Sequence, residues 1–225
     1  MAPVLLSIET STQVCSVAIH KGNSLLAEFS VSEEKSHSKL LTHFIDTIVK
    51  DCGLKLEDMD AFAVSKGPGS FTGLRIGVSA AKGLCFALDK PLISVNTLEA
   101  MAQSVNANNT DKHYVCPMLD ARRMEVYCAL FDADMNYIEQ TEALIIDENS
   151  FREVLEKRKI FFCGNGMQKC RDLLKKYPNS LFVDDIYPSA ADIGSIAFAK
   201  FLKNEFEDLA YFEPFYLKDF YTKVG

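Results

Sequence analysis

Residues 4–31 read VLLSIETSTQVCSVAIHKGNSLLAEFSV, and this stretch decides the fold. It contains three apolar runs rich in strand-forming residues, at 4–9, 14–20 and 25–31. The short polar turn Thr10-Ser11-Thr12-Gln13 separates the first two runs, and Gly22-Asn23 precedes the third. Apolar runs joined by short polar turns are typical of β-hairpins. The chain is therefore predicted to begin with three consecutive strands.

Helices and strands alternate after this opening. The apolar residues from 36 to 52 recur at helical spacing, serines are available as N-caps and Gly53 follows the end, so the pattern predicts an amphipathic helix. A short apolar strand at 61–65 enters the glycine-rich loop 67–73, and the small residues beyond this loop predict a helix to about residue 88. A strand at 91–95 and a helix from 97 to about 105 complete this half.

The second half repeats this order of elements. The predicted elements are strands near 114–119, 125–131 and 137–145, a helix near 149–157, a strand at 160–163 and a helix from 167. Both halves read βββαβα, and a helix near 190–203 and an aromatic tail follow. The polar stretch 106–112 is predicted to link two lobes, 1–106 and 107–225. Duplicated βββαβα lobes predict an α/β protein with the actin-like ATPase fold, which sugar kinases, chaperone ATPases and ribonuclease-H-like proteins share.

The composition is typical of a soluble globular protein. Of the 225 residues, 48% are hydrophobic and 24% are charged, unlike disordered or membrane chains. A net charge of −7 argues against binding of nucleic acid by this chain alone, because such affinity comes from clustered Lys and Arg. The seven cysteines include no Cys-x-x-Cys pair and are expected to be buried in a reducing cytosol. The N-terminal apolar run ends at Glu9, far short of the roughly 20 residues of a membrane span.

Actin-like ATPases hold phosphates in the turn between the first two strands of each lobe. Such a turn needs backbone N–H groups that approach closely, which favours glycine, and a carboxylate near the metal. The turn Glu9-Thr10-Ser11-Thr12 has a carboxylate but no glycine, and its counterpart Asp120-Ala121-Arg122-Arg123 contains two bulky arginines. The sequence therefore predicts a degenerate nucleotide cleft.

Two glycine-containing loops have alternative interpretations. Gly164-Asn165-Gly166 lies between a strand and a helix, where it either approaches an adenine ring or phosphate or forms a tight turn. The loop GPGSFTG at 67–73 lacks the Gly-Lys-Ser/Thr ending of a P-loop. We interpret it as a turn in which Thr72 caps the next helix and Arg75 lies in the first helical turn.

The helix after GPGSFTG carries Gly73, Gly77 and Ala81 at four-residue spacing. A row of small residues allows close helix packing, either with another protein or with the sheet of the same chain. Together with the apolar helix at 36–52, the row predicts a protein interface. The predicted interface residues are His37, Leu40, Leu41, Phe44, Ile45, Ile48, Gly73, Leu74, Ile76, Gly77, Ala80, Ala81 and Leu84.

The sequence predicts no catalytic residues and no metal site. A helical zinc pair has histidines at i and i+4, but the residue four after His37 is Leu41. No Gly-x-Ser-x-Gly nucleophile elbow occurs either.

Seven segments resemble one protein family. They are IETST, SHSKLL, AVSKGPGSFTGLRIGVSAAKGL, LEAMA, DARRMEVYCALF, GNGM and FYLKD. From the first strand to the tail, the chain resembles the TsaB family, also called YeaZ, a bacterial subunit for the biosynthesis of tRNA threonylcarbamoyladenosine. The stretch GPGSFTGLRIG is highly specific for this family.

The resemblance implies a cytoplasmic, non-catalytic subunit. Its partners would be the catalytic paralogue TsaD and the ATPase TsaE, and it would reach tRNA only through their complex. That complex transfers a threonylcarbamoyl group to N6 of the adenosine beside the anticodon, in tRNAs that read codons beginning with A. The family's partner surface is formed by two helices that correspond to 37–52 and 73–88 here, and the same helices are expected to form a homodimer when the partner is absent.

The resemblance also bears on cofactors and on alternatives. No tightly bound cofactor is implied, and weak ATP or ADP binding is expected more readily in the partner complex. Glu9 replaces the family's usual aspartate, and of the two metal-binding histidines of the catalytic relatives only His37 is kept. Two alternatives remain: an independent actin-like ATPase or phosphotransferase that uses Glu9 and Asp120, and a metallopeptidase, which no residue supports.

Overall fold

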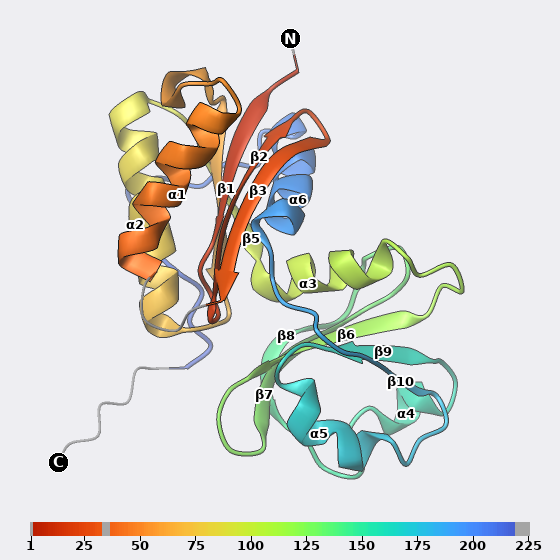
Figure 1. Cartoon of the computed structure of the whole chain (residues 1–225). Coiled ribbons are helices and arrows are strands. Elements are labelled where there is room, and N and C mark those ends of the chain that lie inside the picture. Colours follow the sequence, from red (N-terminus) through yellow and green to blue (C-terminus); the bar gives the residue numbers. More distant parts are fainter. Residues whose placement is uncertain (1, 33–36, 219–225) are drawn as a thin grey trace, which may run out of the picture. The chain divides into compact units, whose positions relative to one another are not determined.

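The computed structural model describes residues 2–32 and 37–218, which form two compact units (Figure 1). The first unit contains Met1–Thr97 and Pro188–Gly225, and the second contains Leu98–Tyr187. This division differs from the expected lobes 1–106 and 107–225. The final helix and tail belong to the first unit, and the helix that begins at Thr97 belongs to the second.

The first unit is built on a five-stranded sheet with the order β3-β2-β1-β4-β5. The strands are β1 (Val4–Glu9), β2 (Val14–Lys21), β3 (Ser24–Ser32), β4 (Ala61–Gly67) and β5 (Leu92–Asn96). The first three pair antiparallel, as the two predicted turns require, and β4 and β5 add in parallel to β1. Strands β1 and β4 are buried almost throughout, so both faces of this sheet must be covered.

Three helices cover this sheet. Figure 1 shows α1 (His37–Asp51) and α2 (Phe71–Leu88) on one face and α6 (Ala190–Leu202) on the other. A single 3₁₀ turn, η1 (Leu56–Asp58), precedes β4. The predicted strands and helices of this half are confirmed, with α2 beginning two residues before the predicted start at 73.

The second unit repeats the same arrangement, with the strand order β10-β9-β6-β7-β8. Its strands are β6 (Tyr114–Asp120), β7 (Glu125–Phe131), β8 (Tyr137–Ile145), β9 (Ile160–Cys163) and β10 (Ser180–Val183). Its helices are α3 (Thr97–Asn106), α4 (Arg152–Leu155) and α5 (Met167–Leu174). The sequence did not predict β10, and the helix predicted at 149–157 is only the short α4.

Each unit contains one helix that comes from the other half of the sequence. Helix α3 follows β5 but packs in the second unit, where Leu98, Met101 and Val105 join a core cluster with residues of β6 and β7. Helix α6 follows β10 but packs in the first unit. There Gly194 faces His20 and Ser7 so closely that a Cβ at this position would overlap the imidazole. These contacts explain why the units do not coincide with the two sequence halves.

Helix α2 packs directly on the turn between β1 and β2. A Cβ added at Gly69 or Gly73 would overlap the backbone carbonyls of Ser11 or Thr10, and one at Gly77 would overlap the Thr10 hydroxyl. The Thr10 hydroxyl donates to the Gly73 carbonyl at 2.8 Å, and the Ser70 N–H donates to the Ser11 carbonyl at 2.6 Å. The glycine row is therefore used inside the first unit.

The N-cap of α2 is Ser70 rather than the predicted Thr72. Its side-chain oxygen accepts from the Gly73 N–H at 3.2 Å, and its backbone is extended. The helix begins earlier than expected because Ser70 is three residues before Gly73, the spacing that an N-cap hydrogen bond needs. Arg75 therefore lies beyond the first turn.

The first prediction compares two glycines of α2. We expect Gly77→Ala to lower the free energy of unfolding by about 1–3 kcal/mol, because the new methyl group must displace the Thr10 turn. A Cβ added at Gly83 would meet no neighbouring group within 4 Å, so Gly83→Ala should raise the free energy of unfolding by about 0.5–1 kcal/mol through helix propensity. Urea unfolding of both variants measures the difference, and equal stability would contradict the packing described above.

The second prediction concerns Asp192 at the start of α6. Burial, followed by the nearby charge of Glu28, raises the pKa of Asp192 to about 6, although a hydrogen bond with Ser189 lowers it. Because the pKa in the folded state exceeds the unfolded value of about 3.9, the folded protein binds more protons between about pH 4 and 6. Stability should therefore fall as the pH rises through this window and stay lower above it.

Asp192→Asn removes this titration. The free energy of unfolding of the variant should vary less between pH 4 and 7, by about 1–2 kcal/mol relative to the unmodified chain. Urea unfolding at both pH values measures the change, with Asp51→Asn on the exposed end of α1 as the matched control. An unchanged pH profile for Asp192→Asn would show that this carboxyl does not carry the effect.

Candidate functional site

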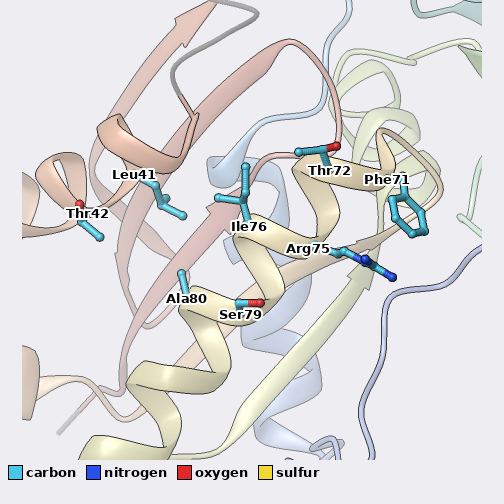
Figure 2. Close-up of a pocket in the computed structure, with 8 residues that line it drawn as sticks. All are labelled: Leu41, Thr42, Phe71, Thr72, Arg75, Ile76, Ser79 and Ala80. Atoms are coloured by element: carbon cyan, nitrogen blue, oxygen red, sulfur yellow. The ribbon is translucent and has the colours of Figure 1, made fainter.

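A groove runs between α1 and α2 on the first unit. Its first section has a volume of about 660 Å³ (Figure 2). Its lining residues are Leu41, Thr42, Phe71, Thr72, Arg75, Ile76, Ser79 and Ala80. A second section of about 600 Å³ shares Thr42, Ser79 and Ala80 with the first, so the two sections adjoin. The second section also contains Ile45, Leu54, Gly83 and Leu84, with charged Asp46, Lys50, Lys55 and Glu57.

Helix α2 presents two different rows of small residues. The row with Gly73, Gly77 and Ala81 is buried against the sheet and the Thr10 turn. The opposite row, which includes Ser79, Ala80 and Gly83, lines the groove. Of the described helices, α2 is the one long and apolar enough to cross a membrane by length and composition, and only 33% of it is buried in the chain. An apolar helix with an uncovered row of small residues is suited to close packing against another protein.

The groove contains part of the predicted interface. Leu41, Ile45, Ile76, Ala80 and Leu84 line it. Ile48, Gly73, Leu74, Gly77 and Ala81 do not line the groove and are buried under the chain's own atoms. Leu41 and Ile45 are also buried in the core, with 1% and 5% of their surface exposed, although they line the groove. The sequence pattern did not separate the two sides of α2, because the sheet needs small and apolar residues on its side of the helix as much as a partner would.

Three predicted residues of α1 lie elsewhere or cannot be placed. Leu40 and Phe44 are half-buried and do not line the groove, and the Phe44 ring lies 6.3 Å from that of Phe29 on β3. His37 begins α1, but its side chain lies outside the described residues, as does Ser36 as a possible cap.

Sequence reasoning missed several groove residues. They are Thr42, Phe71, Thr72, Arg75, Ser79 and Gly83. A signal was present in the second row of small and hydroxyl residues, Thr72, Ser79 and Gly83, which recurs at helical spacing beside the glycine row. Nothing in the spacing alone says which row faces the sheet.

The turn predicted as the first phosphate site is closed by its own contacts. Glu9 is fully buried, its Oε1 accepts a short hydrogen bond from the Ser11 N–H, and burial raises the pKa of this carboxyl. Among the described residues, Glu9 Oε2 has no hydrogen-bond partner. Thr12 Oγ1 accepts from the Val14 N–H at 3.2 Å. Thr10 and Ser11 are bonded to the start of α2 through the Thr10 hydroxyl and the Ser11 carbonyl. The Ser11 hydroxyl has no hydrogen-bond partner among the described residues, but it is buried.

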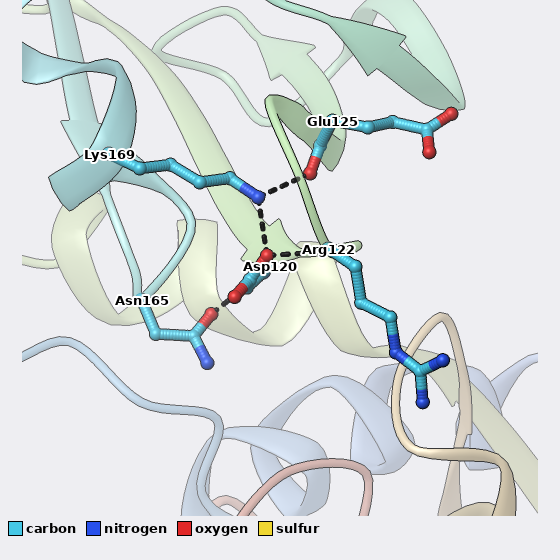
Figure 3. A network of polar contacts seen from close by, with 5 residues as sticks. All are labelled: Asp120, Arg122, Glu125, Asn165 and Lys169. Atoms are coloured by element: carbon cyan, nitrogen blue, oxygen red, sulfur yellow. Dashed lines mark hydrogen bonds and ion pairs between the residues drawn. The ribbon is translucent and has the colours of Figure 1, made fainter.

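The second turn is occupied by a lysine. Figure 3 shows Lys169 of α5 reaching the Asp120 carboxylate, with which it forms a short ion pair, and the Glu125 carbonyl at 2.7 Å. The Arg122 N–H donates to Asp120 Oδ1 at 2.8 Å, and the Asp120 N–H donates to Asn165 Oδ1 at 3.0 Å. Partial burial favours a higher pKa for Asp120, but the bonds from Lys169 and Arg122 and the lysine charge lower that pKa on balance.

This network places an ammonium where a nucleotide site would need a metal ion beside the carboxylate. Sequence reasoning identified Asp120 and Arg122 but missed Lys169, which lies 49 residues from Asp120. Arg122 and Arg123 are exposed, with φ of 72° and 52°. No local sequence pattern relates this lysine to Asp120, because the two side chains meet only when α5 packs beside β6.

The two glycines after β9 have a structural explanation. Gly164 has φ of 90°, and a Cβ there would overlap the Met118 carbonyl. The Gly166 N–H donates to the same carbonyl at 3.0 Å, and a Cβ at Gly166 would press on Leu119. The segment therefore makes the tight strand-to-helix turn that was one of its two interpretations.

Metal-ligating side chains do not gather in the part of the chain that is described. Among residues 2–32 and 37–218, no three His, Cys, Asp or Glu side chains are placed to hold an ion. All seven cysteines are free, and only Cys52 is not buried. Burial raises the pKa of Cys163 to about 12, so this thiol is protonated and unreactive at neutral pH.

Comparison with known proteins agrees with this picture. The family model described as TsaD, tRNA N6-adenosine threonylcarbamoyltransferase, matches residues 24–224. The tRNA threonylcarbamoyladenosine biosynthesis protein TsaB of Escherichia coli K12 is 33% identical over 222 residues, which cover 96% of this chain and 94% of that protein.

Solved structures give the same result. YeaZ from Pseudomonas aeruginosa has 26% identity and a TM-score of 0.82, covering 96% of this chain and 100% of its own. The activator of the 2-hydroxyisocaproyl-CoA dehydratase from Clostridium difficile shares the fold alone, with 10% identity, a TM-score of 0.52 and coverage of 92% and 99%. The chain therefore belongs to the TsaB (YeaZ) family, within the wider TsaD family, and has the actin-like ATPase fold.

Proposed function

We propose that this chain takes part in the synthesis of threonylcarbamoyladenosine on tRNA as a non-catalytic subunit that binds a TsaD-like catalytic paralogue. The observation that carries the proposal is the groove between α1 and α2, where an apolar helix leaves a row of small residues uncovered. The names of its relatives in the TsaB family support the pathway. The match to the TsaD family model supports a partner that is a paralogue with equivalent helices.

The paralogous relationship favours a particular mode of pairing. Two chains with the same fold can pair through equivalent helices about a pseudo-two-fold axis, as identical subunits do about an exact one. The same groove would then form a homodimer when the partner is absent. A TsaE-like ATPase would complete the complex in the cytoplasm, and tRNA would be bound through the partners, since this chain carries a net charge of −7.

A non-catalytic role is supported by the contacts that the carboxyl groups of the two turns, 9–12 and 120–123, already make. The Asp120 carboxylate is neutralised by Lys169, and the Glu9 carboxyl is buried beneath the start of α2. Neither offers a free carboxylate for a magnesium ion, which a phosphotransferase of this fold needs. We therefore favour the partner subunit over an independent ATPase or a metallopeptidase.

The third prediction tests the groove. Gly83 is exposed, so Gly83→Glu should fold, but it would place a charge in a surface that becomes desolvated on pairing. We expect the dissociation constant for the TsaD-like protein of the same genome to rise by about 100-fold, roughly 3 kcal/mol. The added side chain fills space that a partner helix would occupy, and its charge is desolvated on pairing although Lys50 and Lys55 line the same section. Isothermal titration calorimetry measures the affinity, and a modification assay on tRNA reads the consequence.

A matched control separates pairing from folding and net charge. Ala199→Glu adds the same charge to an exposed position of α6, on the other face of the same sheet, and should leave the affinity unchanged. Circular dichroism confirms that both variants are folded. Unchanged affinity of Gly83→Glu would place the partner elsewhere, and lack of any binding by the unmodified chain would refute the partner role.

The fourth prediction concerns nucleotide. We expect the isolated chain to bind ATP or ADP only weakly and without dependence on magnesium, because Lys169 occupies the Asp120 carboxylate. Asp120→Ala should then leave this affinity unchanged, as measured by titration with a fluorescent ATP analogue. Tight magnesium-dependent binding that Asp120→Ala abolishes would favour the independent ATPase.

A further inference from the structure

Among the residues whose side chains the structure describes, Arg75 is the one charged residue that lines the first section of the groove. It is exposed on α2, and the other lining residues are apolar or carry only a hydroxyl. Its guanidinium carbon lies 4.0 Å from the centroid of the Phe71 ring, which is within the range of a cation–π contact. Figure 2 shows Arg75 and Phe71 side by side at one end of the section.

A second aromatic residue fixes Arg75 from another direction. Arg75 Nε donates to the Tyr216 hydroxyl at 3.2 Å, and the Tyr216 ring lies 4.9 Å from the Phe71 ring. Because Nε is used in this bond and the guanidinium is stacked on Phe71, few orientations of the side chain remain. The two terminal nitrogens are the donors that Arg uses for bidentate binding of a carboxylate.

Tyr216 belongs to a C-terminal segment, residues 205–218, which we call the C-terminal strap. The Glu207 N–H donates to the Leu92 carbonyl at 2.9 Å, and the Phe215 N–H donates to the Lys66 carbonyl at 2.7 Å. Lys82 of α2 donates to the Phe212 carbonyl at 2.9 Å. Phe212 also packs against the core of the first unit. A segment distant in sequence is thus anchored on the sheet and on α2, where it fixes an exposed arginine.

Arg75 has no acidic partner in the described chain. Ion pairs are formed within residues 2–32 and 37–218 by other basic side chains, such as Lys169 and Arg171, but not by Arg75. Its polar contact there is with the neutral Tyr216 hydroxyl. A stacked guanidinium that has no acidic partner among the described residues, and whose described neighbours in the groove are uncharged, is complementary to a carboxylate on the protein that covers the groove.

We propose that Arg75 binds a carboxylate of the partner protein at this end of the groove, with Phe71 and Tyr216 holding the guanidinium in position. The inference rests on the proposed function, since it assumes that a protein covers the groove. The occupant is a protein surface that brings an Asp or Glu side chain within an apolar contact area. Arginines buried in this way on binding are frequent hot spots of interfaces.

The fifth prediction tests this contact by calorimetry with the TsaD-like protein of the same genome. We expect Arg75→Gln to weaken binding by about 30- to 100-fold, at the lower end of the range for loss of one partner of a buried charge pair. Arg75→Lys keeps the charge but not the planar fork, so it should recover only part of the affinity. Tyr216→Phe keeps the ring and removes the hydroxyl, and should weaken binding by about threefold, the effect of one modest hydrogen bond.

Lys21→Gln is the matched control, because it removes one exposed positive charge from β2 and should leave binding unchanged. Arg75→Gln should also reduce the dependence of the affinity on salt. Replacing each acidic residue on the partner's docking surface in turn should identify one carboxylate whose loss has no further effect in the Arg75→Gln background.

The outcomes separate the two proposals. If the unmodified chain binds the TsaD-like protein and Arg75→Gln binds equally well, the carboxylate contact is wrong and the partner role stands. If the unmodified chain does not bind, the partner role itself fails. If Arg75→Gln leaves protein binding intact but weakens binding of tRNA by the complex, Arg75 contacts a phosphate, which also overturns the proposal.

Discussion

The first unit depends on the close packing of α2 against the turn between β1 and β2. Gly69 in the preceding loop and Gly73 and Gly77 in α2 allow this segment to contact Ser11 and Thr10 directly. This contact fixes the depth at which α2 lies on the sheet. It also determines which side of the helix faces outward, so the groove with α1 follows from it. The same contact uses the turn that in other members of the fold is available to a phosphate.

The local pattern of the sequence was enough to predict most of the fold. The hairpins at the N-terminus and the alternation of strands and helices after it are confirmed, because apolar runs and polar turns there are long and regular. Strand β10 was missed since SLFV is short and all four residues are half-buried, which leaves no alternation to recognise. The exchange of α3 and α6 could not be predicted, because it depends on contacts between segments far apart in sequence.

The candidate site was predicted only in part. Both helices of the groove were identified from their composition, but α2 carries small residues on two sides, and sequence spacing does not distinguish them. The row with Gly73 and Gly77 packs against the Thr10 turn, and the row with Ser79 and Ala80 lines the groove. The ion pair of Lys169 and the contact of Arg75 with Tyr216 arise from tertiary packing, so no local pattern reports them.

The exchange of helices also has a consequence for biosynthesis. The sheet of the first unit is formed by residues up to Asn96, yet α6, which covers one of its faces, begins at Ala190. A nascent chain therefore carries a sheet with one uncovered apolar face until α6 has left the ribosome. The strap that positions Arg75 emerges after α6. The groove itself is lined by residues 41–84, so these are translated early, and only the contact that positions Arg75 requires the strap.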